Sequence, residues 1–360
     1  MTIVLPRADN VDVLLAGARL EVFRVDLLTR VDGVIGPLDG VESCSVAVDA
    51  DALIGGGGQL QLQDRGQNVA WASQRVQPWV RVNDVEWPLG VFLLSAPVTQ
   101  YSGTGRGWSV QLTDKLTTLD ADQLTESFSV AAGGVLTDAI LAVITAAGET
   151  NVAITPSDAT AQPPGLTWPI GTSRLTVINE LLGALNYDAL RADAYGTLYA
   201  GPATDPANRP VVREFLEGAS AIHEATFEVE RDLATIPNRI ICTWQATPDT
   251  PMQKAVAEDL DPASPTSYPN RGRWVTVTYE NQEADSQATL DAIAAKYLRE
   301  AVALQDTIVF SHAQVPLKLG DVVRFTSADI DVLGEVRRVE SSIGVGQLAT
   351  TTIRKVRDAE

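Results

Sequence analysis

The residues best suited to acid–base, nucleophilic or metal chemistry are few in this 360-residue chain. His223 and His312 are the only histidines, and Cys44 and Cys242 are the only cysteines. Neither cysteine has a histidine or a second cysteine at the spacing that zinc sites use. The chain also lacks the Gly-x-Ser-x-Gly elbow, the zinc-protease helix motif and the aspartate-rich calcium loop. The sequence therefore predicts no catalytic, cofactor-binding or metal-binding residue and no enzymatic activity.

The surroundings of these four residues favour structural roles. His312 alternates with Ile308 and Phe310 along a strand-like run, which indicates a core or interface position. His223 lies in a polar connector and is expected at the surface. Each cysteine sits in an alternating apolar run, so buried free thiols are expected, with a disulfide as the alternative. A Ser-His-Asp triad is defined by geometry rather than by sequence order, so that class of site stays open at this stage.

Two further patterns resemble chemical motifs and are better explained structurally. A glycosidase needs two carboxylates at a set separation, and Asp120 and Asp122 are such a candidate pair. Among 46 acidic residues, however, the existence of a pair carries no information, and a solvated pair is expected. Gly103–Gly107 lacks the Lys-Ser/Thr ending of a phosphate-binding loop and precedes a strand, so it predicts a plain hairpin loop.

The charge balance disfavours nucleic-acid recognition. The formal net charge is −19, and the 27 basic residues are scattered among the acidic ones rather than clustered. A protein that grips phosphates needs clustered Lys and Arg, whereas an acidic wall past which DNA slides is compatible with this balance. The N-terminus has no secretory-signal pattern and no apolar run is long enough to span a bilayer, so assembly in a cytosol without stable membrane insertion is expected.

Residues 1–120 are predicted to form a β-barrel domain. Cys44, Val46 and Val48 alternate with polar or small residues, which places one set on a core face and the other on the opposite face. The same period runs through Gln59–Gln63 and through Trp108–Leu112. Asn83-Asp84 predicts a hairpin turn, and Gly55–Gly58 is expected to be a flexible loop.

Residues 121–205 change to a mixed α+β pattern. Apolar residues from Val135 to Ala147 lie on one helical stripe, and Gly148 is a typical C-terminal stop. A second helix is predicted to begin near Thr172 or Ser173, either of which can cap it. A hairpin turning at Tyr195-Gly196 follows. These elements predict an interposed helix-hairpin domain.

Residues 206–360 are predicted to form a second β-barrel domain with a helical insertion around 250–303. Pro248–Pro269 is expected to be a loop, and Asp285 to cap a helix whose stripe includes Ile293 and Tyr297. Strands are expected at 225–229 and 240–244, and then at 307–313, 321–326, 334–341 and 349–356. The predicted fold class is therefore β-rich α+β, with two β-barrel-like domains, an interposed α+β domain and a further helix-bearing insertion.

An ordered set of segments resembles the tail-tip or baseplate hub proteins of bacteriophages, a family shared with contractile injection systems. The helix and hairpin of Thr172–Ala200 are similar to the helix and hairpin of these hubs. Ile236–Cys242 resembles the strand that begins their second barrel, Ser286–Ala301 their Ala-rich helix, and Pro316–Val323 the entry to their final barrel. The resemblance covers about two-thirds of the chain, from about Val135 onward.

The resemblance implies a structural role at the virion tail tip, in a particle assembled in the bacterial host cytoplasm. It implies a homotrimeric ring that joins the tail tube to distal tail, tape measure, fibre or spike proteins and encloses the DNA exit channel, through which DNA passes without specific binding. No cofactor is implied. Three alternatives stay open: the hub of an injection system or gene-transfer particle, a tail-associated cell-wall or polysaccharide hydrolase, and a receptor-binding module, although aromatic content is only 6%.

Overall fold

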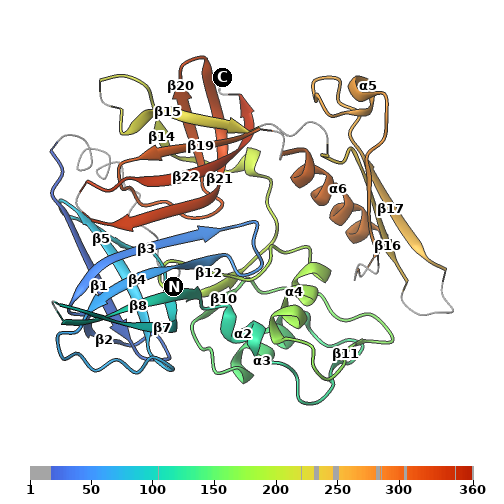
Figure 1. Cartoon of the computed structure of the whole chain (residues 1–360). Coiled ribbons are helices and arrows are strands. Elements are labelled where there is room, and N and C mark those ends of the chain that lie inside the picture. The colour runs from blue at the N-terminus through green and yellow to red at the C-terminus, as the bar shows by residue number, and fades with distance from the viewer. Residues whose placement is uncertain are drawn as a thin grey trace.

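β-Strands dominate the computed structural model, and most of them join one sheet (Figure 1). The structure describes residues 18–103, 105–219, 221–230, 235–245, 251–280, 284, 286–303, 306–344 and 346–358. Within them, the largest sheet has 14 strands, in the order β15-β19-β22-β21-β3-β4-β8-β7-β5-β1-β2. In addition, β20 pairs with β21, β14 pairs with β20, and β6 pairs with β5. Two β regions that are far apart in the sequence therefore belong to one sheet.

The first β region supplies the strands of one half of this sheet. They are β1 (Glu21–Leu28), β2 (Val34–Pro37), β3 (Val41–Asp49), β4 (Gly56–Gln63), β5 (Arg75–Val82), β6 (Val85–Pro88), β7 (Phe92–Ser102) and β8 (Gly105–Asp114). Alternate residues such as Leu60, Leu62 and Val110 are fully buried in their core. The predicted turn at Asn83-Asp84 is confirmed, because β5 and β6 pair across it.

The prediction of a flexible loop at Gly55–Gly58 is wrong for all but Gly55, which lies outside any strand. Residues 56–58 belong to β4 and pair with both β3 and β8. A Cβ atom on Gly58 would lie 2.1 Å from the carbonyl oxygen of Ser45, and one on Gly56 would lie 2.5 Å from the Asp114 carboxylate. These glycines therefore permit a close approach of neighbouring strands rather than chain flexibility.

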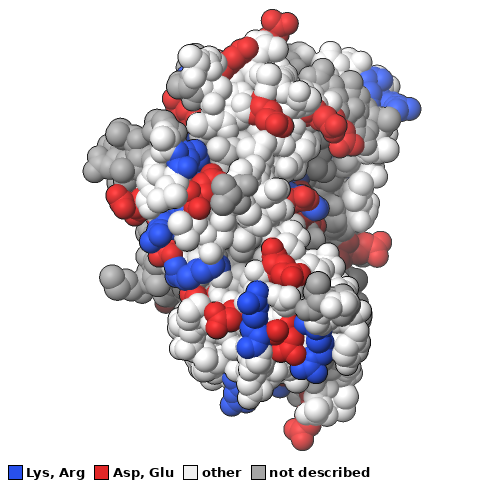
Figure 2. All heavy atoms as spheres, turned by 60° about the vertical axis from the view of Figure 1, so that its left-hand side comes forward, with Lys and Arg blue, Asp and Glu red and all other residues white. Residues whose placement is uncertain are grey.

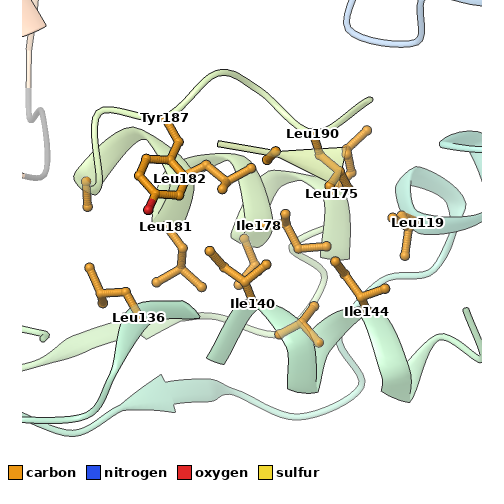
Figure 3. Close-up of a cluster of buried hydrophobic side chains, with 14 of the residues drawn as sticks. Leu119, Leu136, Ile140, Ile144, Leu175, Ile178, Leu181, Leu182, Tyr187 and Leu190 are labelled. Atoms are coloured by element: carbon orange, nitrogen blue, oxygen red, sulfur yellow. The ribbon is translucent and has the colours of Figure 1, made fainter. Parts of the chain in front are cut away.

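Residues 116–208 form the α+β unit. Its elements are α2 (Thr117–Ala121), β9 (Phe128–Val130), α3 (Leu136–Ala146), β10 (Val152–Ile154), β11 (Leu166–Trp168), α4 (Arg174–Ala184), β12 (Arg191–Ala192), β13 (Leu198–Ala200) and the 3₁₀ turn η1 (Pro206–Asn208). Figure 3 shows α3 and α4 facing each other through Ile140, Ile178 and Leu181, all fully buried. Both helices are as predicted: Ser173 caps α4 by accepting a hydrogen bond from the Thr176 amide, and Gly148 follows α3 with a φ of 83°.

The second β region contributes the other half of the large sheet. Its strands are β14 (Val211–Phe215), β15 (His223–Glu230), β19 (Thr307–His312), β20 (Val322–Ser327), β21 (Ile330–Ile343) and β22 (Ala349–Asp358). The predicted strands in this part of the chain are confirmed, although the one at 240–244 belongs to a separate small sheet. The core behind them contains Phe310 and Phe325 together with Val80, Val82 and Trp87 of the first region. One hydrophobic cluster therefore draws on both β regions.

Between β15 and β19 the chain forms a separate insertion unit. It consists of β16 (Arg239–Trp244), β17 (Gln253–Glu258), α5 (Tyr268–Arg271), β18 (Thr276–Tyr279) and α6 (Gln287–Ala303). β16 lies in a three-stranded sheet of order β17-β16-β18, with α6 packed against β16 and β17. The expectation that this strand begins the second barrel is wrong, because its buried residues Ile240 and Cys242 contact α6.

The expected loop at Pro248–Pro269 is also wrong in part, because β17 occupies 253–258 and pairs along its full length with β16. The predicted helix of this unit is present as α6, and the side chain of Ser286 accepts a hydrogen bond from the Thr289 amide at its start. The predicted cap Asp285 lies outside the described residues. So does Thr104, while the predicted hairpin is present as the paired strands β7 and β8.

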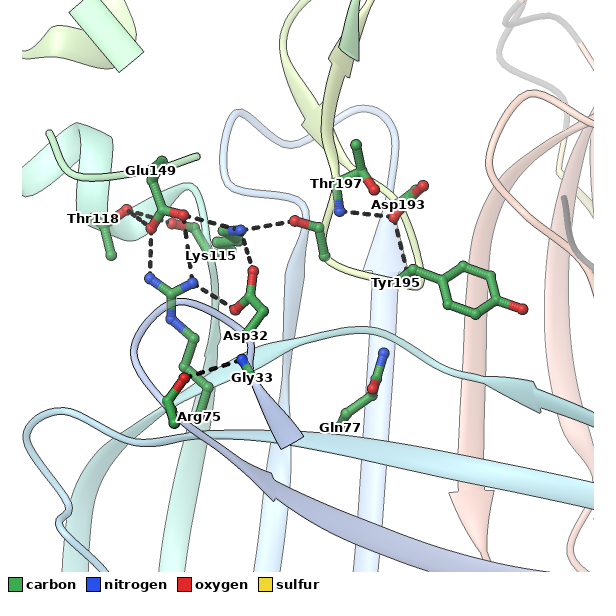
Figure 4. A network of polar contacts seen from close by, with 12 residues as sticks. Asp32, Gly33, Arg75, Gln77, Lys115, Thr118, Glu149, Asp193, Tyr195 and Thr197 are labelled. Carbon is green, nitrogen blue, oxygen red and sulfur yellow. Dashed lines mark hydrogen bonds and ion pairs between the residues drawn. The ribbon is translucent and has the colours of Figure 1, made fainter. Parts of the chain in front are cut away.

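A buried ionic cluster holds the α+β unit against the first β region (Figure 4). Arg75, at the start of β5, contacts Asp32 at 2.6 Å and Glu149 at 2.5 Å. Lys115, which follows β8 and is fully buried, contacts the same two carboxylates at 2.5 and 2.9 Å. Two cations and two carboxylates therefore form one compact, mutually neutralised group.

The cluster also reaches the hairpin of the α+β unit. Lys115 Nζ donates to the carbonyl oxygen of Gly196, at 2.7 Å. Gly196 has a φ of 81°, and a Cβ there would lie 2.9 Å from Val91, so the turn requires glycine. Burial acts to lower the pKa of the Arg75 guanidinium, but hydrogen bonds to Glu149 and Asp32 outweigh it and raise that pKa above its ordinary value. The interactions therefore keep Arg75 charged at the junction.

Replacing Glu149 by Ala should destabilise the protein strongly. The change leaves Arg75 and Lys115 buried with one carboxylate between them, and losing one partner of a buried ion pair costs about 3–5 kcal/mol. Urea unfolding monitored by circular dichroism measures the effect. Glu340→Ala is the control, because Glu340 also pairs with an arginine but is exposed, and the loss should be within about 1 kcal/mol. Equal losses in the two variants would contradict the structural role of the cluster.

Candidate functional site: a neutral sheet face with exposed hairpin tips

His312 is a core residue, as its strand period predicts. Its side chain is fully buried, with Nδ1 2.8 Å from the carbonyl oxygen of Ala313 and Nε2 2.7 Å from the Thr351 hydroxyl. A carbonyl oxygen only accepts, so Nδ1 carries the proton, and neutral Nε2 accepts from Thr351. Burial lowers the pKa of His312 to about 4. The histidine is therefore neutral at pH 7 and fully occupied by structural hydrogen bonds.

The expectation that His223 lies at the surface is wrong. Its side chain is only 9% exposed, and its ring lies 5.2 Å from the ring of Phe325. The register of β15 on β19 places His223 opposite His312, within the aromatic core. Burial again lowers the pKa of this histidine. The polar sequence around it reflects the exposed residues of an edge strand, on which alternate positions face opposite sides.

The other predicted candidates are also structural. Cys44 and Cys242 are buried free thiols, as expected, and burial raises their pKa values to about 12 and about 11. Asp120 and Asp122 lie at the end of α2, and Asp122 accepts a hydrogen bond from Arg174 at 2.6 Å. Within the described residues no group of three His, Cys, Asp or Glu side chains is placed to hold a metal ion.

One face of the large sheet has an unusual composition. Directly paired residues of antiparallel strands lie on the same side of a sheet, so the registers connect rows across β22, β21, β3, β4 and β8. We call this side the neutral face. Its residues are Thr350, Thr352, Arg338, Glu340, Ser342, Ser43, Ser45, Ala47, Asp49, Gln59, Gln61, Gln63, Ser109, Gln111 and Thr113. Most are hydroxyl or amide side chains, and the charged ones are Arg338, Glu340 and Asp49.

The few charges on the neutral face pair with one another. Arg338 contacts Asp49 at 3.2 Å and also donates from Nε to Glu340 at 2.7 Å. The amides of Gln59 and Gln61 both donate to the Ser109 hydroxyl, at 3.0 and 2.9 Å. This face therefore presents a laterally hydrogen-bonded layer with almost no free charge, although the whole chain carries a net charge of −19.

Two hairpin tips expose apolar side chains at the surface. At the β1–β2 tip, Val34 is 68% and Ile35 51% exposed, on a strand at the end of the sheet order. Near the β7–β8 tip, Tyr101 is 80% exposed, and Val98, which pairs with Ser109 beside the neutral face, is 59% exposed. Apolar residues that gather on exposed hairpins are typical of protein contacts. These tips are candidate assembly surfaces.

The charged side chains are mixed on the face that Figure 2 shows. On the side shown in Figure 2, Lys and Arg lie among Asp and Glu rather than gathering together. Among the described residues, no helix combines the length and apolar character that crossing a bilayer requires. The candidate functional features are thus the neutral face and the hairpin tips.

Solved structures with this fold include phage tail proteins. A tail protein from Neisseria meningitidis MC58 superposes with a TM-score of 0.68 at 14% identity, over 92% of this chain and 96% of that one. The 43 kDa tail protein of prophage MuSo2 from Shewanella oneidensis gives 0.64 at 12% identity, over 93% and 99%. No protein-family model and no curated protein sequence matches the chain.

A secretion-system protein shares the fold as well. The E. coli c3393 protein, a component of the type VI secretion system described as structurally similar to the T4 tail proteins gp27 and gp5, gives a TM-score of 0.54 at 10% identity, over 93% of this chain and 78% of that one. The chain therefore has the fold of tail-tip and baseplate hub proteins, and the resemblance inferred from its sequence is confirmed at the level of fold.

The buried histidine should make stability depend on pH. The pKa of His312 falls from 6.5 to about 4 on folding, so between those values the unfolded chain binds a proton that the folded chain does not. Stability should therefore rise with pH through that window and level off above about 6.5, by up to about 3 kcal/mol from this residue. Urea unfolding of wild type and His312→Gln at several pH values tests this. The same slope in both would contradict the assignment.

Proposed function

We propose that the chain is the structural hub of a bacteriophage tail tip, a ring that joins the tail tube to distal proteins and encloses the DNA exit channel. The fold of tail and baseplate proteins supports a tail-associated structural role. In this proposal the two β regions are two barrel-like domains, 1–120 and 206–360, with 121–205 and the insertion on the outside. Three copies place six similar β regions around one axis.

The neutral face is the observation that carries the channel assignment. DNA binds proteins chiefly through Lys and Arg, which neutralise phosphates and release counterions. The basic residue of this face, Arg338, is already paired with two carboxylates. Hydroxyl and amide groups hold water and attract no counterion. A channel wall of this composition lets duplex DNA pass without holding it.

The hairpin tips supply contacts for the assembly. Val34 and Ile35 at the β1–β2 tip and Val98 and Tyr101 near the β7–β8 tip are exposed in the single chain, and burial against neighbours stabilises such groups. The partners in this proposal are the other two copies, the tail tube, distal tail and tape measure proteins, and a fibre or spike, all at the virion tail tip. The likeness to the c3393 protein favours a second candidate, the hub of a contractile injection system.

The assembled form should contain three copies. Native mass spectrometry of the purified chain, and imaging of particles that carry a labelled copy, measure the copy number. Val34→Asp with Ile35→Asp should weaken assembly, because charge at a buried contact is costly. Leu260→Asp is the control, since Leu260 is also exposed but lies in the insertion unit. A two-fold or six-fold copy number in the particle would exclude the proposed ring.

The assembled ring should bind duplex DNA no more tightly than a generic acidic protein at physiological salt. Even basic proteins reach only about 10⁻⁴ to 10⁻⁶ M through contacts that do not depend on sequence. A gel-shift titration of the oligomer with a random duplex measures the affinity. Sub-micromolar, salt-sensitive binding would overturn the channel assignment.

Lysines placed on the neutral face locate the channel directly. Particles with Ser45→Lys, Gln59→Lys and Gln111→Lys should eject DNA more slowly, with a salt-dependent delay, because the new ammonium groups hold phosphates. Gln253→Lys, Thr276→Lys and Thr278→Lys are matched control changes, at exposed strand positions of the insertion unit. Equal delays in both sets, or none in the first, would show that DNA does not pass the neutral face.

A further inference from the structure

A two-part groove separates the α+β unit from the insertion unit. One hollow of about 380 Å³ lies between the segment 160–172 and Trp244 at the end of β16. A second, of about 280 Å³, lies between residues 157–159, the end of α4 and the first turns of α6. Ala184 lines both, so the two hollows adjoin along the same boundary. Grooves between structural units are common ligand sites.

The larger hollow combines aromatic surface with a carboxylate. Trp168 and Trp244 both line it, together with Glu180 from the exposed side of α4. Trp168 packs against Phe128, with ring centroids 5.8 Å apart, and its Nε1 donates to Glu180 Oε2 at 2.5 Å. The indole is fixed by these contacts, and it holds one oxygen of the Glu180 carboxylate while the other can accept from a ligand.

The smaller hollow has small walls and an unmatched acceptor. Ala159, Ala288 and Ala292 leave room along it. Asn186 also lines it, and its Oδ1 is buried without a hydrogen-bond partner among the described residues. A buried acceptor without a donor costs roughly 1–3 kcal/mol. A ligand that brings a hydroxyl or amide proton to this oxygen would remove that cost.

We propose that this groove binds a neutral oligosaccharide. Among the described residues, neither hollow is lined by Lys or Arg, so phosphate or other anionic ligands meet no counter-charge from them. Threonine and serine hydroxyls and the amide of Gln162 stand between the apolar surfaces, which does not suit a lipid chain. A sugar presents a C–H face to the half-buried indole of Trp244 and hydroxyl donors to Glu180 and Asn186, and its linear polymer spans both hollows. Among the described residues that line the two hollows, Glu180 is the one acidic side chain.

Nuclear magnetic resonance titration of the full chain tests the groove with cellohexaose, maltohexaose and chitohexaose as probes. At least one should bind with roughly millimolar affinity and shift signals of the Trp168 and Trp244 indoles. Trp244→Ala and Glu180→Gln should each weaken binding by about tenfold or more. Tyr101→Ala, which removes an exposed aromatic far from the groove in the sequence, should leave it unchanged.

Each other outcome would overturn the proposal. The proposal would be excluded if none of the three sugars bound at concentrations well above millimolar. The proposal would also be excluded if the Tyr101→Ala change weakened sugar binding as much as the Trp244→Ala change does. An extended neutral peptide that binds in the groove where no sugar does would assign it to a protein partner instead. Ring formation plays no part in the measurement, so the result is independent of the proposed hub function.

Discussion

The antiparallel pairing of β21 with β3 is the interaction on which the rest of the architecture depends. It joins Arg338–Ile343 to Cys44–Asp49 and so links strands almost 300 residues apart into one sheet. β21 also pairs with β20 and β22, which places it at the centre of the second β region. With the two regions fixed edge to edge, Val80, Val82 and Trp87 of the first can complete the core around Phe310 of the second. Separating the regions would expose that shared core.

The buried ionic cluster fixes the α+β unit on the first β region through ion pairs rather than through strand pairing. Apolar packing is tolerant of small rotations, whereas Arg75 and Lys115 each need both Asp32 and Glu149 at hydrogen-bond distance. A buried ion pair contributes little net stability compared with apolar residues, but a wrong arrangement leaves charges unpaired at a large cost. The cluster therefore selects one orientation of the unit on the sheet. That orientation also determines where the groove beside α4 lies.

The sequence predicted the elements whose signals are local. Ser173, Gly148 and Asn83 each act within a few residues, and each does what its type predicts. The failures involve partners distant in the sequence. Gly58 signals flexibility when considered alone and close strand approach once β3 and β8 are beside it, and His223 is buried only because β15 pairs with β19.

The candidate site was visible from the sequence only in fragments. The alternation of Gln59, Gln61 and Gln63 with leucines showed that one side of β4 is uncharged and polar. Nothing in that run showed that Ser45 and Ser342 extend the same row across two more strands, because register between distant strands is set by the folded sheet. Likewise, Asn186 and Trp244 line the same groove only because the α+β unit and the insertion unit pack together.

The neutral face is significant because most of the charges of this acidic chain lie elsewhere. A chain with a net charge of −19 could place carboxylates on this sheet without burying them, because the positions are exposed or half-exposed. An acidic wall would repel a polyanion while gathering cations, and a basic one would bind it. Hydroxyl and amide groups do neither. The side-chain amides of Gln59 and Gln61 also donate hydrogen bonds to the Ser109 hydroxyl, so part of their hydrogen-bonding capacity is used within the surface itself. A surface of this kind minimises interaction with whatever moves past it, and that distinguishes it physically from the apolar hairpin tips, which gain stability when covered.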